Sequence, residues 1–377
     1  MRIAVNTRLL LPNRLEGIGR FKHEVLRRLV ARHPEHQFLF LFDRPFDEAF
    51  VYGSQVRAVQ LPPPSRHPLL WYLWFEWAVP LALRTHKADV FLSMDGYCSL
   101  RTKVPTVMVT HDIAHVHYPG QVPAAARWYY QYFVPRYLQR ADELVTVSNF
   151  CRQDIHAQYG VPAEQIRVAG NAAKPSFVPL SNTEKDAVKQ QYSKGEDYFF
   201  YLGALHPRKN IIRLLQAFDL FKKQTGSSMK LLVGGRLAWQ SGSIKVAYEN
   251  ASSRADIHFL GYVSDEDLPR LTGAALALTY VSLFEGFGVP IIEAMQAGVP
   301  VMTSNVSSMP EVAGDAALLV DPTDEQQIAQ GMQHLMADQQ LRQTLIAKGT
   351  QRAAQFSWEN TTDIIEEAIN AAVRGND

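Results

Sequence analysis

The chain has 377 residues, of which 47% are hydrophobic and 20% charged, with a formal net charge of +1. This length exceeds what one hydrophobic core usually holds, so two packed domains are expected. No arginine-rich tract or aromatic RNA-binding motif is present, which disfavours nucleic acid as a partner. Two cysteines are too few for a disulfide scaffold and fit a reducing compartment.

Apolar strands alternate with helical patterns along both halves of the chain, as a parallel α/β sheet requires. In the first half, strands are predicted at Ile3–Asn6, Phe38–Phe42, Val90–Leu92, Thr106–Val109 and Leu144–Val147. In the second half, they are predicted at Tyr198–Leu202, Lys230–Val233, Ile257–Phe259, Leu276–Thr279, Pro300–Thr303 and Ala317–Val320. We therefore expect two α/β domains, at residues 1–171 and 198–356, with a linker at 172–197 and a final helix within 357–377.

The first residues run directly into a strand without a signal-peptide pattern, so a cytoplasmic location is expected. The tryptophan-dense stretch 69–80 is too short to span a bilayer, and Glu76 and Pro80 interrupt it. We expect an amphipathic helix that covers the first sheet, with contact to a membrane surface as the second interpretation.

Charge is divided unevenly between the two halves. Residues 1–170 carry 20 Lys and Arg against 14 Asp and Glu, whereas residues 171–377 carry 18 against 23. A basic first domain would suit the anionic inner face of a membrane or a lipid-diphosphate acceptor. Ordinary asymmetry of a protein surface is the alternative.

Two glutamates, Glu285 and Glu293, stand eight positions apart across two glycines and a predicted helix start. Pro290 is expected as the first helical residue, which places Glu293 about 5 Å into the helix. Gly286 and Gly288 let backbone amides approach an anion, and the helix start adds a partial positive charge of ~0.5. Because carboxylates repel phosphate, the glutamates should face the sugar and ribose hydroxyls of a nucleotide sugar. The alternative is a helix whose acidic start only suits its dipole.

Arg208 and Lys209 follow the predicted strand that ends at Leu202 and precede a helical pattern. Two cations at the carboxyl edge of an α/β sheet would offset the ~2 negative charges of a diphosphate, a task often given to Mg²⁺. A solvated surface pair is the alternative interpretation. We expect no metal and no cofactor, and the nucleotide sugar would be a co-substrate. His111, His115 and His117 cluster in the sequence but lack the further ligands of a zinc site.

These segments, with several others, resemble the retaining glycosyltransferases of family 4, which include many bacterial mannosyltransferases and enzymes of lipopolysaccharide or polysaccharide assembly. The resemblance runs nearly end to end and rests on Gly17-Ile18-Gly19-Arg20, Thr110-His111-Asp112, Thr146-Val147-Ser148-Asn149-Phe150, Pro207-Arg208-Lys209-Asn210, Leu232-Val233-Gly234-Gly235, Phe259-Leu260-Gly261-Tyr262-Val263 and the segment from Glu285 to Glu293. It implies the GT-B architecture, in which two Rossmann-like domains face each other across a cleft. The first domain would bind the acceptor, the second would bind the nucleotide sugar, and the final helix would pack back onto the first.

The resemblance also implies roles for individual residues. The residues expected at the catalytic centre are His111, Arg208, Lys209 and Glu285. Those expected to bind the donor are Gly17, Gly19, Gly203, Arg208, Lys209, Tyr262, Val263, Glu285, Gly286, Phe287, Gly288 and Glu293. By the resemblance, Arg208 and Lys209 hold the diphosphate, Glu293 holds the ribose, and Glu285 and His111 contact the transferred sugar.

The expected function is a retaining transfer of a hexose, with mannose from GDP-mannose as the first choice, onto a glycan or lipid-linked acceptor in surface polysaccharide or lipopolysaccharide biosynthesis. Two alternatives stay open: a UDP-sugar transferase or epimerase of the same architecture, and a noncatalytic nucleotide-sugar-binding subunit. A nicotinamide dehydrogenase is disfavoured, because Gly17-Ile18-Gly19 lies about eleven residues past the first strand and lacks the third glycine of the dinucleotide fingerprint.

Overall fold

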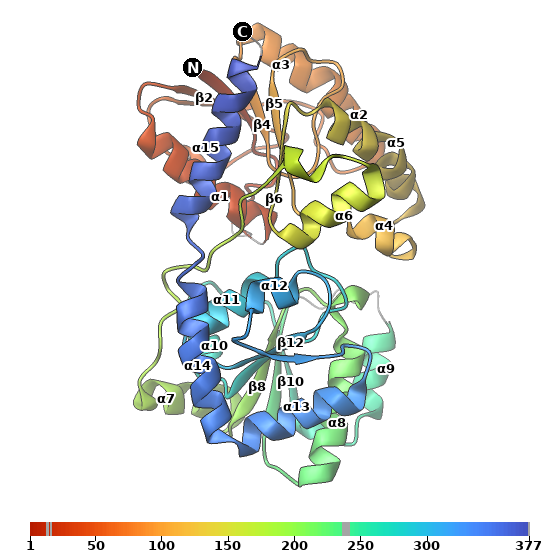
Figure 1. Ribbon diagram of the computed structural model, residues 1–377, viewed down its shortest axis with the longest axis vertical. Coiled ribbons are helices and arrows are strands. Elements are labelled where there is room, and N and C mark those ends of the chain that lie inside the picture. The colour runs from red at the N-terminus through yellow and green to blue at the C-terminus, as the bar shows by residue number, and fades with distance from the viewer. Residues whose placement is uncertain (13–14, 16, 236–241, 376–377) are drawn as a thin grey trace. The chain divides into compact units, whose positions relative to one another are not determined.

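The computed structural model describes residues 1–12, 15, 17–235 and 242–375, and the chain divides into two compact units (Figure 1). The first unit comprises Met1–Asn171 together with Trp358–Asp377, and the second comprises Ala172–Ser357. Each unit contains its own parallel sheet with helices packed against it. This is the two-domain, Rossmann-like arrangement of a GT-B fold.

The described residues of the first unit form a seven-stranded parallel sheet in the order β3-β2-β1-β4-β5-β6-β7. Its strands are β1 (Arg2–Asn6), β2 (Gln37–Phe42), β3 (Val56–Gln60), β4 (Val90–Ser93), β5 (Thr106–Thr110), β6 (Glu143–Thr146) and β7 (Ile166–Val168). All five predicted strands are present. The two edge strands, β3 and β7, were not predicted, because edge strands lack the continuous apolar run of a strand buried on both faces. The strand order reverses between β1 and β4, which is where open α/β sheets usually bind ligands.

The helices of the first unit cover this sheet. They are α1 (Ile18–Arg32), α2 (Pro68–Leu73), α3 (Val79–Thr85), α4 (Ala114–His117), α5 (Ala124–Arg140), α6 (Asn149–Tyr159) and α15 (Trp358–Arg374). Phe21, Val25 and Leu29 recur every fourth residue on α1 and are buried, so this helix presents an apolar stripe to the core.

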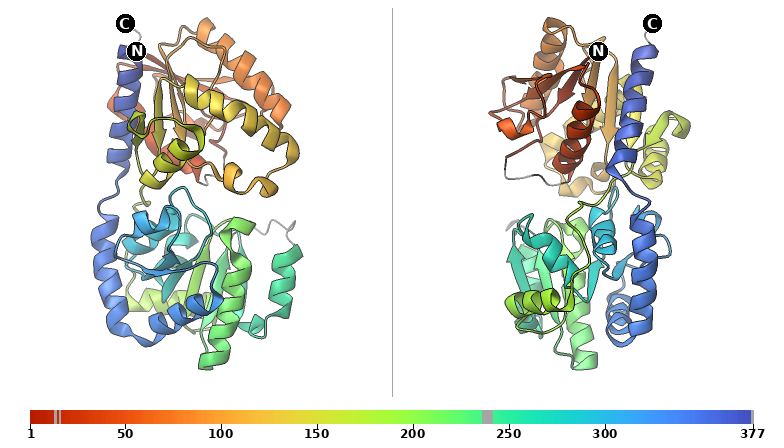
Figure 2. Two further views of the ribbon diagram at one scale, coloured as in Figure 1. Left: turned by 45° about the vertical axis from the view of Figure 1, so that its right-hand side comes forward. Right: turned by 90° about the vertical axis from the view of Figure 1, so that its left-hand side faces the viewer.

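The final helix, α15, packs on α1 and beside strands β4 to β7, and the blue C-terminal segment lies along the first unit in both views of Figure 2. Glu359 and Asp363 on this helix pair with Arg28 and Arg32 of α1. Residues 358–377 hold five acidic side chains and one arginine, so the first unit as folded has a net charge near +2 rather than the +6 of residues 1–170. The basic domain expected from the sequence is therefore largely neutralised by a segment that is distant in the chain.

The tryptophan-dense stretch 69–80 lies in α2, in a π-helical turn at Trp74–Ala78 and in the first residues of α3. Trp74 and Phe75 are fully buried in the core of the first unit, as expected for a helix that covers the sheet. The solvent-facing side of this helical stretch is also apolar, since it carries Trp77, whose side chain is more than half exposed. Among the described residues, none of the helices combines the length and the apolar character that crossing a membrane demands.

The described residues of the second unit form a six-stranded parallel sheet in the order β10-β9-β8-β11-β12-β13. Its strands are β8 (Tyr198–Leu202), β9 (Lys230–Gly234), β10 (Ile257–Gly261), β11 (Ala277–Tyr280), β12 (Val301–Ser304) and β13 (Leu318–Val320). All six correspond to predicted strands. Here the strand order reverses between β8 and β11.

The helices of the second unit are α7 (Asn182–Ser193), α8 (Ile211–Thr225), α9 (Gly242–Asn250), α10 (Asp267–Gly273), α11 (Val289–Gln296), α12 (Met309–Ala313), α13 (Glu325–Ala337) and α14 (Gln339–Ala353). The segment 172–197, expected to be a linker, belongs to this unit and contains α7. Ser181 and Glu184 form a capping box at the start of α7, a signal that the polar composition of the segment concealed.

Candidate active site

Two loops of the second unit form the candidate site, and each follows one of the strands at the reversal of strand order. The loop after β8 carries Arg208 and Lys209, and the loop after β11 carries Glu285. Asn210 joins the two loops, because its buried side-chain amide donates to the carbonyl oxygens of Val281 (3.0 Å) and Pro322 (2.6 Å). Its left-handed backbone (φ 62°) turns the chain into α8, a conformation that asparagine tolerates better than most residues.

Glu285 is the centre of this site and is only 6% exposed. The Lys209 ammonium donates to its Oε1 at 2.5 Å, and the Tyr280 hydroxyl donates to the same oxygen at 2.7 Å. Arg208 places a guanidinium nitrogen 4.0 Å from Oε2. Burial disfavours the carboxylate, but Lys209 and Arg208 outweigh it and hold the pKa of Glu285 below its usual value. The site therefore holds two cations around one ionised acid.

The backbone around Glu285 is fixed by two serines that precede and begin the turn into α12. The Ser308 hydroxyl lies 2.9 Å from the carbonyl oxygen of Glu285 and 3.0 Å from that of Phe287. The Ser307 hydroxyl accepts from the backbone amide of Glu285 at 3.2 Å. These contacts hold the 285–287 segment, which contains Gly286, at one position before α11 begins.

Gly288 adopts φ +95° and forms the N-cap of α11, a conformation that a side chain would strain. The helix begins at Val289, so Pro290 is its second residue and not its first as predicted. Glu293 is consequently the fifth residue of α11, and it is 7% exposed. Both glutamates of the predicted pair belong to this unit, one in the loop and one in the helix.

Gly203 begins the loop after β8, and its carbonyl oxygen lies so close to Gly235 that a Cβ on Gly235 would be 1.9 Å away. A larger residue at position 235 would therefore displace this loop. Tyr262 and Val263 follow β10 at the edge of the sheet, where Val263 packs on Gly234 and the Tyr262 side chain is half exposed. These two predicted donor-binding residues thus follow a strand that lies two strands away from β8, which precedes Arg208 and Lys209.

The other predicted site residues, His111, Gly17 and Gly19, belong to the first unit. Gly17 (φ +46°) is the N-cap of α1, and Gly19 approaches the Leu9 carbonyl so closely that a Cβ would be 2.7 Å away. His111 follows β5 directly, and its Nε2 lies 3.1 Å from the Met94 carbonyl oxygen. Because a carbonyl only accepts, Nε2 carries the proton and Nδ1 is left as an acceptor.

The environment of His111 favours the neutral ring. Burial is the largest influence and lowers the pKa of His111 to about 4. The Phe21 ring and the imidazole form a T-shaped pair with ring centroids 4.8 Å apart and planes at 89°. At neutral pH the side chain is therefore an uncharged acceptor held in one tautomer.

Several residues of these sites were not predicted from the sequence. Tyr280, the last residue of β11, supplies a hydrogen bond to Glu285. In the first unit, Arg8 and Asp95 each lie two residues past a strand at the reversal of strand order, and their side chains are bonded at 2.8 Å. Their positions just after β1 and β4 could have indicated a site. Without knowledge of the strand order, however, the sequence does not distinguish these residues from ordinary charged surface residues.

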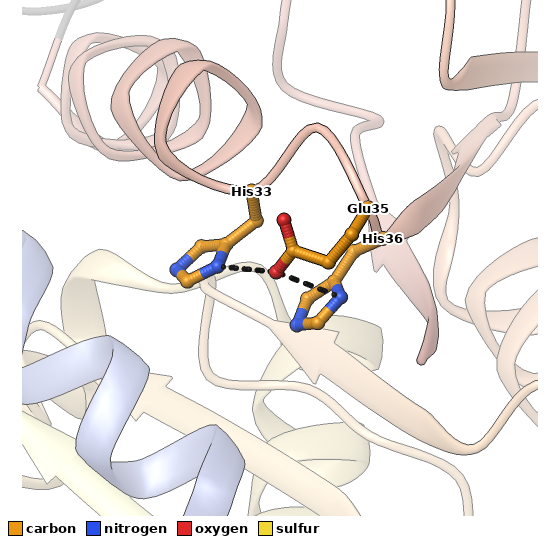
Figure 3. Close-up of side chains that lie close together, drawn as sticks. All are labelled: His33, Glu35 and His36. Carbon is orange, nitrogen blue, oxygen red and sulfur yellow. Dashed lines mark hydrogen bonds and ion pairs between the residues drawn. The ribbon is translucent and has the colours of Figure 1, made fainter.

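A separate group of metal-binding residue types lies between α1 and β2 (Figure 3). Nδ1 of His33 lies 3.0 Å and Nδ1 of His36 lies 3.3 Å from the same oxygen of Glu35. The two rings stack with centroids 4.9 Å apart and planes at 10°. One carboxylate oxygen between two ring nitrogens is a hydrogen-bonded arrangement rather than a coordination shell. The group also lies at the amino edge of the first sheet, opposite the edge that carries His111.

The candidate site can do two things chemically. Its cations and helix start suit an anionic group such as a diphosphate. Its carboxylates suit hydroxyl donors such as those of a sugar or ribose. The arrangement therefore fits a nucleoside diphosphate sugar.

Comparisons with known proteins identify the family of this chain. Residues 15–177 match the family described as Glycosyltransferase Family 4, and residues 182–352 match Glycosyl transferases group 1. The chain is 34% identical to O-antigen chain mannosyltransferase B of Escherichia coli over 95% of this chain and 96% of that protein. It is 30% identical to O-antigen chain mannosyltransferase RfbU of Salmonella typhimurium over 68% of each.

A solved structure, the sucrose-phosphate synthase of Thermosynechococcus elongatus, superposes with a TM-score of 0.78 over 97% of both chains at 18% identity, which supports the fold alone. The near full-length identity to the E. coli protein and the two family matches establish more than the fold. The chain belongs to glycosyltransferase family 4.

Proposed function

We propose that this glycosyltransferase moves mannose from GDP-mannose onto a glycan or lipid-linked acceptor during the assembly of an O-antigen or a similar surface polysaccharide. Its relative over nearly the full length is an O-antigen chain mannosyltransferase, which supports the sugar and the acceptor class. The single structural observation that supports catalysis is the pairing of Arg208 and Lys209 with the buried Glu285 at the reversal of strand order.

In this proposal, the two cations and the start of α11 stabilise the donor's diphosphate and the further charge that develops on it as the glycosidic bond breaks. Glu285 and Glu293 accept hydrogen bonds from sugar and ribose hydroxyls. When the diphosphate binds, Lys209 lies between two anions, so it orients the Glu285 carboxylate while it neutralises phosphate charge. His111, Gly17 and Gly19 receive their sugar and phosphate roles from the family resemblance, as do the amides of Gly286, Phe287 and Gly288.

We further propose that the transfer retains the anomeric configuration and needs no metal. The bond from the anomeric carbon to the diphosphate oxygen breaks, and the acceptor hydroxyl bonds to the same face of that carbon. The acceptor proton passes to the departing diphosphate. Two side-chain cations can supply the charge that Mg²⁺ supplies elsewhere, which is the physical argument for metal independence.

We also propose that the first unit binds the inner surface of a membrane through one apolar face, called here the α2–α3 stripe. It consists of Leu69, Leu73, Trp77 and Leu81, which recur every fourth residue and are 37–62% exposed. Two exposed aromatic side chains of α5, Trp128 and Tyr132, extend the apolar surface, because α2 contacts α5.

Arginines accompany this apolar face. The Arg101 guanidinium lies 4.1 Å from the Trp77 ring centroid, and that of Arg136 lies 3.8 Å from the Tyr132 centroid. Aromatic and aliphatic side chains with arginines beside them suit the boundary between anionic head groups and acyl chains. A lipid-linked acceptor would be reached at such a surface.

The donor proposal is tested by thermal unfolding with GDP, UDP, ADP and dTDP and their common sugars, each with and without EDTA. A ligand that binds only the folded protein raises the unfolding midpoint by mass action. We expect GDP and GDP-mannose to raise it equally with and without EDTA. A response to UDP ligands alone would replace the donor, and no response to any nucleotide would contradict the donor proposal.

A further inference from the structure

A buried charged cluster lies at the reversal of strand order in the first unit, and the proposed function gives it no role. It consists of Arg8, Lys22 and Asp95, of which Lys22 is fully buried and the other two are 7% exposed. The Lys22 ammonium and the Arg8 Nε donate to the same oxygen of Asp95, at 2.9 and 2.8 Å. The side-chain amide of Asn6 donates to the other oxygen at 2.8 Å.

This cluster joins three elements. Asn6 and Arg8 lie at and just after the end of β1, Asp95 lies just after β4, and Lys22 is on α1. Lys22 also donates to the Asn6 carbonyl at 3.0 Å. Gly96 completes the turn after β4 by donating its amide to Val109 of β5 at 2.8 Å. The loop that contains Met94 and Asp95 is therefore fixed from both sides.

The same loop holds His111. The Met94 carbonyl that accepts from His111 Nε2 belongs to the residue directly before Asp95. Phe21, whose ring forms a T-shaped pair with the imidazole, is the residue directly before Lys22. Both residues that contact the His111 ring are thus directly adjacent in the chain to a member of the charged cluster.

We propose that Lys22 and Asp95 are positioning residues that hold His111 as a neutral ring, protonated on Nε2, with Nδ1 presented as an acceptor for a hydroxyl of the substrate. The part of this inference that concerns the substrate rests on the proposed function. The part that concerns the tautomer does not.

The groups around His111 act on its pKa in opposite directions. Burial is the main cause of the low pKa and the Lys22 charge lowers it further, whereas the hydrogen bond to Met94 and the carboxylates of Asp112 and Asp95 raise it. Lys22, Arg8 and Asp95 together carry one excess positive charge while Lys22 is protonated. Burial lowers the pKa of Lys22 to about 8, so this excess persists at pH 7.

The inference is tested in the full-length protein by ¹⁵N NMR of the histidine side chains, with the His111 signals identified by their loss in His111→Gln. The wild type should show a neutral His111 protonated on Nε2. In Lys22→Met we expect mixed tautomers and a His111 pKa raised by about one unit, about tenfold in the protonation constant. Transfer should fall at least about tenfold in kcat, while GDP affinity changes much less, because Arg208, Lys209 and Glu293 are in the other unit. Lys22→Arg should restore the tautomer.

Glu76→Gln is the matched control for damage to buried polar contacts. Glu76 is a buried carboxylate of the same unit that contacts Leu100 and Tyr137 rather than the loop that holds His111. The Glu76→Gln variant should therefore show the same His111 signals as the wild type. If Lys22→Met does not fold, Arg8→Lys tests the same loop, with mixed His111 tautomers as the expected result.

An unchanged His111 tautomer and pKa in a folded Lys22→Met or Arg8→Lys variant would overturn the inference, even if wild-type transfer is found. Altered signals in these variants together with absent transfer in the wild type would leave the inference standing and reject the proposed function instead.

Discussion

The ammonium nitrogen of Lys209 lies 2.5 Å from Oε1 of Glu285, and this ion pair joins the loops that follow β8 and β11. A cation proposed to bind phosphate and an acid proposed to bind sugar thus contact each other directly. The pair is buried, with 12% and 8% of the two side chains exposed, so replacing either partner leaves a poorly solvated charge. Variants at this site must therefore be compared by ligand binding as well as by transfer.

Glu285→Ala should abolish transfer while it spares the affinity for GDP, because the carboxylate is assigned to sugar hydroxyls. A loss of about 100- to 1,000-fold in kcat is the scale for one electrostatic contact at a transition state. Arg208→Ala should instead weaken GDP binding about tenfold or more, since it removes a phosphate contact. Calorimetry with GDP distinguishes the two variants by their affinity for GDP. Equal losses of GDP affinity in both variants would reject this assignment of roles.

Tyr280→Phe should lower transfer about fivefold, the equivalent of one hydrogen bond of ~1 kcal/mol, because the hydroxyl that donates to Glu285 is lost. The control is Tyr201→Phe. The Tyr201 ring stacks on Tyr280, but its hydroxyl has no hydrogen-bond partner among the described residues. Steady-state kinetics of both variants should show a change only for Tyr280→Phe, and equal losses would mean that the hydrogen bond to Glu285 does not account for the effect.

The depressed pKa of His111 predicts a pH dependence of stability. An unfolded histidine titrates near 6.5, whereas the folded pKa is about 4. The unfolded state therefore binds more protons between these values, and stability falls as pH falls from about 6.5 to 4. His111→Gln removes this contribution. We expect the thermal midpoint of the wild type to fall more steeply than that of the variant over this range, and parallel curves would contradict the assigned pKa.

Replacing Trp77 and Leu81 by serine should weaken binding to vesicles that contain anionic lipid by about 100-fold or more. Burying one such side chain contributes ~1.5–3 kcal/mol, which is about tenfold or more per residue. The matched control is Val178→Ser with Val246→Ser, because these valines of the second unit are also about half exposed. Vesicle sedimentation measures both pairs. If the two pairs behave alike, the α2–α3 stripe is not the membrane contact.

Much of the fold follows from the sequence, because strands buried on both faces have continuous apolar runs that require no knowledge of their neighbours. The edge strand β3 and the helix α7 lack that signal. Arg208, Lys209 and Glu285 could be predicted because each lies in a short motif beside a strand end. The partnership of Arg8, Lys22 and Asp95 could not, since it depends on which strands are adjacent and not on spacing along the chain. For the same reason, the neutralising effect of α15 on the first unit was not visible in the charge of either half.

In the proposed reaction, this protein transfers mannose from GDP-mannose with retention of configuration and without a metal. The most direct measurement is transfer from GDP-mannose to a lipid-linked O-antigen acceptor in EDTA, with the anomeric configuration of the product read from its one-bond carbon–proton coupling by NMR. We expect an α-mannosyl product at the same rate with and without EDTA. A β-linked product, or transfer that requires added Mg²⁺, would contradict it.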